Sequence, residues 1–263
     1  MGDLSAGRMI GFGACISGML LQRMDYSGKF FPDMQPLNVF VVALIAMLVC
    51  AAFGTVTGFF IAYLNVPPFI ATLAMMEIVY GIGLIVTNAT PLGGYVEQYT
   101  NVSNGKFLGI NYLIWIAIIV AVITWFIFNM TRHGKYMYAI GGNPQAAEVA
   151  GVPVKATLIL IYMKAAAMYG LAGFMLGAKA GGASVQTGYG YEMEAIAACT
   201  IGGVSVTGGR GKVSSAIVGV AVFELLKAAL QYLGVDTNYQ YIAQGIVIVV
   251  AIALDIRKYI AKK

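Results

Sequence analysis

The chain has 263 residues, of which 60% are hydrophobic and only 10% are charged. Soluble domains carry about a quarter charged residues, so this composition excludes an ordinary soluble protein and indicates a membrane protein. The net charge of +5 is modest, and we expect no nucleic-acid partner. Cys15, Cys50 and Cys199 all lie in apolar runs, where we expect small buried hydrophobic residues and neither a disulfide set nor a metal site.

Apolar segments follow one another along the chain, and a membrane-spanning helix needs about 20 residues. Most of the segments meet that length, but 9–21 and 193–204 are short, so each is expected to be a broken helix or one extended by small flanking residues. The eight segments cover residues 9–21, 39–63, 69–87, 112–130, 156–178, 193–204, 213–233 and 239–256. This pattern predicts an all-α, polytopic transmembrane helix bundle that forms a single domain over residues 1–263 and lies in a lipid bilayer.

A weak internal repeat places DLSAGR, residues 3–8, over SVTGGR, residues 205–210. Irregular backbone at membrane depth is tolerated only inside protein or beside a watery cavity, and interrupted helices in matching repeats indicate transport sites. These stretches are therefore candidates for a polar translocation path, although the alternative is that their glycines only allow helices to pack. The candidate path residues are Asp3, Ser5, Gly7, Gly202, Gly203, Ser205, Thr207, Gly208 and Gly209.

Two charged residues lie at matching depth in two apolar segments. Glu77 and Lys164 each lie eight residues beyond the start of their segment, which is roughly 12 Å at about 1.5 Å per residue. Because a charge is costly in hydrocarbon, we predict an intramembrane ion pair between Glu77 and Lys164. The alternative is that Lys164 extends to the inner surface. Glu224 and Lys227, three residues apart, are expected to pair on their own helix.

The stretch AIGGNPQAAEVAGVPV, residues 139–154, is a short polar segment between two long apolar runs. Asn143 is a good N-cap, Pro144 fits the first helical turn, and Gly151 is able to end the helix. A capped polar helix held between two spans is suited to passing force from a soluble partner into a membrane bundle. The alternative is a connecting loop without a partner.

Lysine and arginine placement predicts the orientation, because these residues are enriched in cytoplasmic loops. With a cytoplasmic C-terminus, the inside holds Arg8, Arg132, Lys135, Lys155, Arg210, Lys212, Arg257, Lys258, Lys262 and Lys263. The outside then holds only Arg23, Lys29, Lys106 and Lys179. This topology places residues 139–154 inside and the stretch GYGYEMEA outside. There, Tyr189, Tyr191, Glu192 and Glu194 are candidates for a periplasmic entrance, with a solvated rim as the alternative.

Enzyme motifs are absent from the sequence. It contains no HExxH, no GxSxG at a strand–helix turn, no metal-spaced Cys/His set and no GxxxxGK[ST], so the chain is not itself an ATPase. We expect a transport protein that is not an enzyme and holds neither a metal nor a cofactor. An ion-coupled secondary transporter also has many spans and intramembrane charges, but it needs no protruding cytoplasmic helix.

Five stretches in order resemble the permease subunits of ABC importers for monosaccharides, the ribose, xylose and galactose group. They are DLSAGR, NVPPFIATLAMM, TRHGKYMYAIGGNPQAAEVAGV, YEMEAIAACTIGGVSVTGGRGK and YQYIAQGIVIVVAIALD, and the resemblance extends over nearly the whole chain. DLSAGR and AIAAC are most similar to the galactose and methyl galactoside members. Relative to that family about two N-terminal spans are absent. That agrees with the repeat, in which a leading run, residues 195–203, precedes only the second copy.

The resemblance implies a subunit that imports a monosaccharide, galactose or methyl galactoside, across the bacterial inner membrane; ribose and xylose are alternatives. The expected partners are a second permease copy, a periplasmic sugar-binding protein and an ABC ATPase subunit that binds ATP and magnesium. Residues 131–155 then form the cytoplasmic coupling loop that docks on the ATPase. The resemblance assigns this coupling role to Asn143, Pro144, Ala146, Ala147, Glu148 and Gly151.

Overall fold

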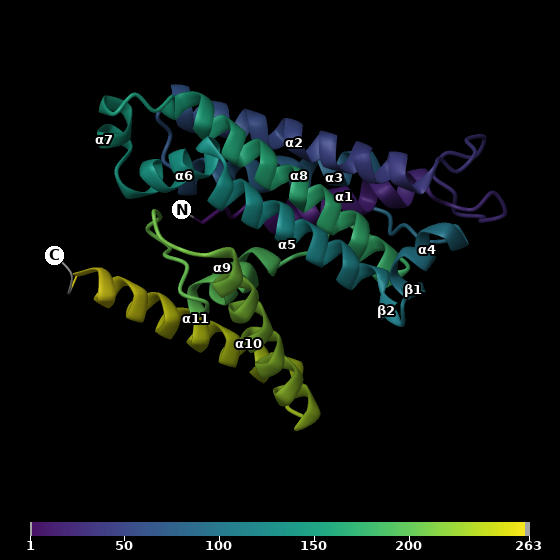
Figure 1. The fold of residues 1–263 in the computed structure, drawn as a ribbon. Helices are drawn as coiled ribbons and strands as arrows, with labels where there is room; N and C mark the ends of the chain where they lie inside the picture. The colour runs from purple at the N-terminus through teal and green to yellow at the C-terminus, as the bar shows by residue number, and fades with distance from the viewer. Residues whose placement is uncertain (1, 261–263) are drawn as a thin grey trace. The chain divides into compact units, whose positions relative to one another are not determined.

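The structure, a computed structural model, describes residues 2–260, without the side chains of residues 237, 254–256 and 258–260. Its described part is helical apart from one two-stranded hairpin (Figure 1). Lys262 and Lys263, counted above for the orientation, lie outside the described residues. The elements are α1 (Ala6–Leu20), α2 (Val39–Tyr63), α3 (Pro68–Thr87), α4 (Glu97–Asn104), β1 (Lys106–Phe107), β2 (Ile110–Asn111), α5 (Tyr112–Met130), α6 (Arg132–Gly142), α7 (Pro144–Val149), α8 (Val154–Ala180), α9 (Tyr191–Ile201), α10 (Val213–Tyr232) and α11 (Thr237–Ile260).

Five of the described helices, α2, α3, α5, α8 and α10, are long and apolar enough to cross a membrane. Each of the eight apolar segments coincides with a helix, which confirms the all-α, polytopic prediction. The number of eight spans is not confirmed, because α1, with 15 residues, and α9, with 11 residues, are shorter than a span. The helix in residues 193–204 ends before the apolar segment does, because two glycines, Gly202 and Gly203, end α9.

The chain divides into two compact units, and each is described by itself. The α1–α3–α8 unit comprises residues 3–120 and 155–189. The α9–α11 unit comprises residues 1–2, 121–154 and 190–263. That the two act as a single permease domain stays a prediction.

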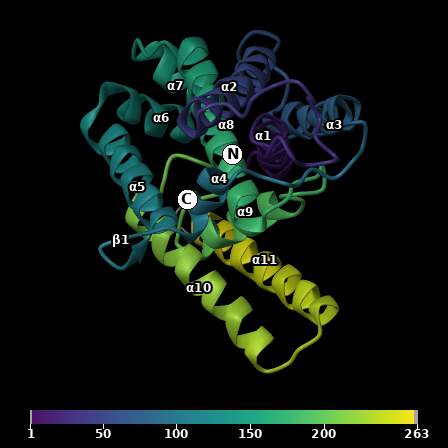
Figure 2. The same ribbon diagram turned by 90° about the vertical axis from the view of Figure 1, so that its right-hand side faces the viewer.

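Small residues bring the helices of the α1–α3–α8 unit into close contact. A Cβ atom added to Gly173 of α8 would lie 2.1 Å from the Ile10 carbonyl oxygen of α1, and one added to Gly54 of α2 would lie 2.4 Å from the Tyr162 carbonyl oxygen of α8. Only glycine allows such an approach, as expected for helices that associate in lipid. The core between α1, α2 and α3 is filled by large apolar side chains such as Met9 and Phe12, with Figure 2 showing α1 beside α3 and α8.

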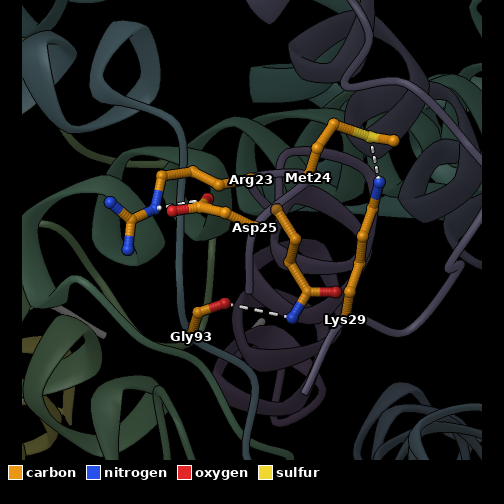
Figure 3. A network of polar contacts seen from close by, with 6 residues as sticks. Arg23, Met24, Asp25, Lys29 and Gly93 are labelled. Atoms are coloured by element: carbon orange, nitrogen blue, oxygen red, sulfur yellow. Dashed lines mark hydrogen bonds and ion pairs between the residues drawn. The ribbon is translucent and has the colours of Figure 1, made fainter. Parts of the chain in front are cut away.

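Residues 21–38, which connect α1 to α2, are ordered by a network of polar contacts (Figure 3). The buried Gln22 side chain donates to the Gly93 carbonyl oxygen at 3.0 Å and accepts from the Phe30 backbone amide at 2.7 Å. Arg23 pairs with Asp25 at 3.6 Å on the surface. Nearby, the buried Tyr99 hydroxyl of α4 donates to the Phe174 carbonyl oxygen of α8 at 2.7 Å, and burial raises the pKa of Tyr99. These contacts hold α4, the α1–α2 connection and the α3–α4 connection at one end of the helices of this unit.

The α9–α11 unit is built on close packing of α9 against α10. A Cβ atom added to Gly219 of α10 would lie 2.0 Å from the Ala198 carbonyl oxygen of α9. Phe223 of α10 is buried in a small core with Ala197 and Ala198. After α10 the chain turns through Gly234, with φ of +71°, into α11, which packs against α9 and also contacts α10.

Candidate functional site

The short polar helix α7 is present and begins and ends where its capping residues predict. The Asn143 side chain accepts a hydrogen bond from the Ala146 amide at 3.0 Å, and Pro144 is the first helical residue. At the other end Gly151 adopts φ of +82°. The Val152 amide donates to the Ala147 carbonyl oxygen at 3.0 Å and the Gly151 amide donates to that of Glu148 at 2.9 Å, which is a Schellman motif.

One face of α7 differs from the prediction. Ala147, expected to face the ATPase, is buried with 4% exposure, so the prediction that it is presented to a partner is wrong. The helix α7 contacts the preceding helix α6, and Ala147 is the buried residue of α7. Ala146 and Glu148 are exposed as predicted, and the neighbouring Val149 is 92% exposed, an outward apolar residue that sequence reasoning missed.

The first copy of the repeat forms the start of α1. The Asp3 carboxylate accepts from the Ser5 backbone amide at 2.9 Å and from the Ser5 hydroxyl at 2.6 Å, while the Tyr169 hydroxyl of α8 donates to its other oxygen at 3.2 Å. Ser5 and Gly7 are buried, and Gly7 is helical. Asp3 therefore holds the start of α1 against the middle of α8, where Tyr169 lies.

Residues 181–190, which follow α8, run back along α1 and α3. A Cβ atom on Gly11 would lie 2.2 Å from the Thr187 carbonyl oxygen, and one on Gly188 would lie 2.7 Å from that of Gly7. The Gln186 amide donates to the Tyr80 hydroxyl at 3.1 Å, and Tyr80 lies seven residues before the end of α3 at Thr87. At about 1.5 Å per residue Tyr80 lies about 10 Å below that helix end, and we name residues 181–190 the re-entrant segment.

Arg8 belongs to this region, and its place on the cytoplasmic side stays a prediction. Its guanidinium lies 4.1 Å from the centre of the Tyr80 ring and 4.7 Å from that of the Tyr189 ring. It donates to the Val185 carbonyl oxygen at 3.1 Å and to the Gln186 side-chain oxygen at 2.9 Å. Sequence reasoning missed Tyr80 and Gln186, because nothing local links α3 to a loop a hundred residues later.

The second copy of the repeat lies in the glycine loop, residues 202–212, between α9 and α10. Gly203 and Gly208 adopt φ of +84° and +99°, and the Ser205 and Thr207 hydroxyls lie 2.9 Å apart. Gly202 is packed so closely that an added Cβ would lie 2.1 Å from the Ser215 carbonyl oxygen. The two copies of the repeat thus differ in backbone, one helical and one a left-handed loop.

The tip of the glycine loop lies against α6, next to the start of α7. Cβ atoms added to Gly208 and Gly209 would lie 3.0 Å from the Gly141 carbonyl oxygen and 2.8 Å from the Gly142 amide nitrogen. The Tyr138 hydroxyl of α6 donates to the Gly211 carbonyl oxygen at 2.8 Å. For Gly202, Gly208 and Gly209 this geometry gives the packing role that the sequence left as an alternative, and a path role stays a prediction.

The candidate entrance residues lie in different surroundings. Tyr189 and Tyr191 are exposed, whereas Glu192 is 6% exposed and its Oε2 has no hydrogen-bond partner among the described residues, so Glu192 is not part of a solvated rim. Glu194 pairs with Lys227 of α10 at 2.9 Å. Sequence reasoning had linked Lys227 only to Glu224, and that pair is confirmed at 3.6 Å.

The predicted Glu77–Lys164 ion pair is wrong for this structure. The ion pairs within the described residues join other groups, and both Glu77 and Lys164 are exposed. Met75 and Val79 mark the buried face of α3, and Glu77, two residues from each, lies about 200° around the helix from them. Lys164 has the same relation to Tyr162 and Ala166 of α8. The depths match, but both side chains lie on faces directed away from the core.

A pocket of about 560 Å³ lies within the α1–α3–α8 unit, between the first turns of α2, the helix α4 and the first half of α5. Its wall is apolar, with Val39, Trp115 and Ile119 as examples, and a few amides such as Asn38 and Asn101 at its margin. None of the candidate path residues lines it.

Comparison with known proteins agrees with a permease architecture. The profile of the family described as "Branched-chain amino acid transport system / permease component" matches residues 1–252. The galactose/methyl galactoside import permease proteins of Haemophilus influenzae and Escherichia coli are each 41% identical over 99% of this chain and 80% of their own length. The ribose import permease protein of Escherichia coli is 35% identical over 84% of this chain and 70% of its own length.

No solved structure matches the chain significantly. The match of the family profile extends over nearly the whole chain, and the galactose/methyl galactoside import permease proteins match 99% of it. The described helices provide the apolar spans that such a subunit needs. The chain therefore belongs to the family of transport-system permease components and is a multi-pass, all-α membrane protein.

Proposed function

We propose that the chain is the membrane permease subunit of an ABC importer that carries galactose or methyl galactoside across the bacterial inner membrane. The names of the relatives at 41% identity support the substrate. The C-terminus lies in the cytoplasm, and the chain works with a second copy of itself, a periplasmic sugar-binding protein and an ATPase subunit. ATP and magnesium bind to the ATPase, so this chain contributes no cofactor-binding group.

The observation that carries this proposal is the geometry of α7. A helix of six residues that is capped at both ends is rigid despite its length, because its terminal amides and carbonyls are satisfied locally. It contacts α6 and buries Ala147, and its outer side presents Ala146, Glu148 and Val149. An exposed valine beside a carboxylate is suited to a partner groove with an apolar floor and a basic rim.

Movement of α7 has a route into the membrane helices. The glycine loop touches α6 at Gly141 and Gly142, immediately before Asn143, and leads directly into α9 and α10. ATP-driven displacement of α7 is thereby passed to α9 and α10 through backbone contacts that have no flexible side chain between them. The re-entrant segment, residues 181–190, supplies polar groups for the path in the other unit, because irregular backbone at this depth requires a watery cavity or a protein cover.

Co-purification tests the proposal. The chain is extracted with a mild detergent from cells that make the whole import system, as wild type, as Val149→Arg and as Leu108→Arg. Leu108 is a matched control, since it is 79% exposed and precedes α5, whereas α7 follows it. We expect an ATPase subunit with the wild type and with Leu108→Arg, and at least a tenfold loss with Val149→Arg. Equal recovery with Val149→Arg would refute the role of α7.

A ribose import permease is the second candidate, because such a relative is 35% identical. Uptake of labelled galactose and labelled ribose by the same cells separates the two. Competition by unlabelled galactose but not by ribose supports the proposed substrate, and the reverse result would replace it.

A further inference from the structure

The Arg8 cluster, defined as Arg8, Tyr80, Gln186 and Tyr189, joins α1, α3 and the re-entrant segment. The Arg8 guanidinium lies 4.1 Å from the centre of the Tyr80 ring and 4.7 Å from that of the Tyr189 ring. The two cation–π contacts restrict the guanidinium, whose N–H groups donate in the plane of the group. The arrangement presents the edge of a flat, fixed donor group.

The donors on that edge are only partly used. A guanidinium carries five N–H groups, and Arg8 Nη1 donates to the Val185 carbonyl oxygen and the Gln186 side-chain oxygen. The N–H groups on Nε and Nη2 have no acceptor among the described residues. Gln186 is itself fixed, because its amide donates to the Tyr80 hydroxyl at 3.1 Å. Three donors therefore remain for a ligand in a rigid setting.

The charge of Arg8 has no carboxylate partner in the part of the chain that the structure describes. An unpaired cation about 10 Å inside a span is costly in lipid, and such groups face the bundle interior or a water-filled cavity. Gln186 is exposed and Tyr189 is 67% exposed, so the cluster is open on one side. Its position and its polarity together require water or a polar solute on that side.

We propose that the Arg8 cluster is a hydroxyl-recognising subsite of the translocation path. It takes a neutral, polyhydroxylated solute, whose hydroxyl oxygens accept from Arg8 Nε and Nη2 while the Tyr189 hydroxyl and the Gln186 amide offer further polar contacts. A neutral solute forms no ion pair with the guanidinium, so Arg8 stays charged and hydrated before and after the solute passes. Release of the solute is therefore not blocked by a tight ion pair. This inference rests on the proposed sugar transport.

A substrate–variant cycle tests the subsite. Initial rates of ATP-driven uptake are measured for galactose and for its 2-, 3-, 4- and 6-deoxy analogues in proteoliposomes that hold the complete import system. The same sugar-binding protein is used with the wild type and the variant, so its preference among the sugars cancels in the ratio of the two uptake rates. We expect Arg8→Met to lower galactose uptake about tenfold, which corresponds to the loss of one hydrogen bond to a charged donor. Uptake of the one deoxy analogue that lacks the hydroxyl bound by Arg8 is expected to change less than twofold.

Controls separate recognition from structure. Arg23→Met removes a surface arginine outside the cluster and is expected to leave every rate within twofold. If Arg8→Met does not assemble, the cycle is run with Gln186→Ala, an exposed position, and with Arg8→Lys, which keeps the charge but not the planar edge. An equal loss for galactose and all deoxy analogues would overturn the subsite and assign Arg8 a packing role. Wild-type proteoliposomes that import no galactose would instead overturn the proposed function.

Discussion

Replacing Gly209 with alanine tests the contact between the glycine loop and α6. Gly209 adopts φ of +72°, and an added Cβ would lie 2.8 Å from the Gly142 amide nitrogen and 3.0 Å from the Gly141 carbonyl carbon. These neighbours are backbone atoms, so they are unable to rotate away as a side chain would. The variant therefore pays for an unfavourable φ and for a displaced backbone at the same time.

Two neighbouring glycines separate these two costs. Gly203 adopts φ of +84° but has no atom within 4 Å of an added Cβ, so Gly203→Ala is expected to cost only the left-handed conformation, about 1–2 kcal/mol. Gly209→Ala adds overpacking of about 1–3 kcal/mol. Gly142 is helical and has open space around an added Cβ, so Gly142→Ala is expected to be neutral or to stabilise by up to about 1 kcal/mol.

The assay is denaturant unfolding of the purified chain in detergent, together with ATP-driven galactose uptake for each variant. We expect the order of stability Gly142→Ala, Gly203→Ala, Gly209→Ala, from highest to lowest. Uptake is expected to fall most for Gly209→Ala, because the loop lies beside the start of α7. A free energy of unfolding for Gly209→Ala equal to that of Gly203→Ala would refute the close approach of the loop to α6.

Three further changes give graded outcomes. Glu194→Gln is expected to cost about 1–3 kcal/mol in unfolding free energy, since Glu194 is 24% exposed and lies 2.9 Å from Lys227; Glu224→Gln, at 59% exposure and 3.6 Å, is expected to cost less than about 1 kcal/mol in the same measurement. Asn143→Ala removes the cap of α7 and is expected to lower ATPase co-purification while costing about 1 kcal/mol of local helix stability, measured by amide hydrogen exchange. Gly54→Leu is expected to abolish folding, because its Cβ would lie 2.4 Å from a carbonyl oxygen of α8, and gel filtration in detergent checks this.

Each of these has a contradicting result. Equal destabilisation by the two glutamine variants would show that the shorter pair is not the stronger one. Unchanged amide hydrogen exchange in residues 144–149 after Asn143→Ala would show that the Asn143 cap does not stabilise α7. A monodisperse Gly54→Leu protein with wild-type stability would show that α2 and α8 do not meet as described.

The boundaries of α7 were accessible from sequence because capping is local. Asn143, Pro144 and Gly151 each satisfy or restrict backbone within a few residues, so their types alone define the helix. The face of α7 was not accessible. Whether Ala147 or Val149 points outward depends on the tertiary packing around α7. Ala146, Ala147 and Val149 are all apolar, so the sequence does not indicate which of them faces outward.

The ion pair failed for a related reason. Depth along a helix follows from counting residues, and Glu77 and Lys164 do share a depth. Direction around a helix follows from an amphipathic pattern, and helices in lipid are apolar on every side. The small-residue positions that mark the packed faces, such as Ala71 and Gly83 on α3 and Ala166 on α8, were the available signal for direction.

The re-entrant segment was hidden in a different way. Residues 181–190 form a short segment rich in small and polar residues, as is a surface loop, and the glycines at 11, 83 and 188 permit the close approach. The repeat indicated that both copies matter, but similar letters do not fix the same backbone. Gly7 is helical, whereas its counterpart Gly209 is left-handed.

ATP-driven sugar uptake by the purified system is the most direct test of the central claim. Proteoliposomes are prepared with the chain and its ATPase subunit, the sugar-binding protein is added outside, and ATP is enclosed. The account predicts accumulation of labelled galactose that requires ATP, persists without proton and sodium gradients, and falls at least tenfold with Val149→Arg but not with Leu108→Arg. Uptake that follows an ion gradient, or that is the same with Val149→Arg, would contradict it.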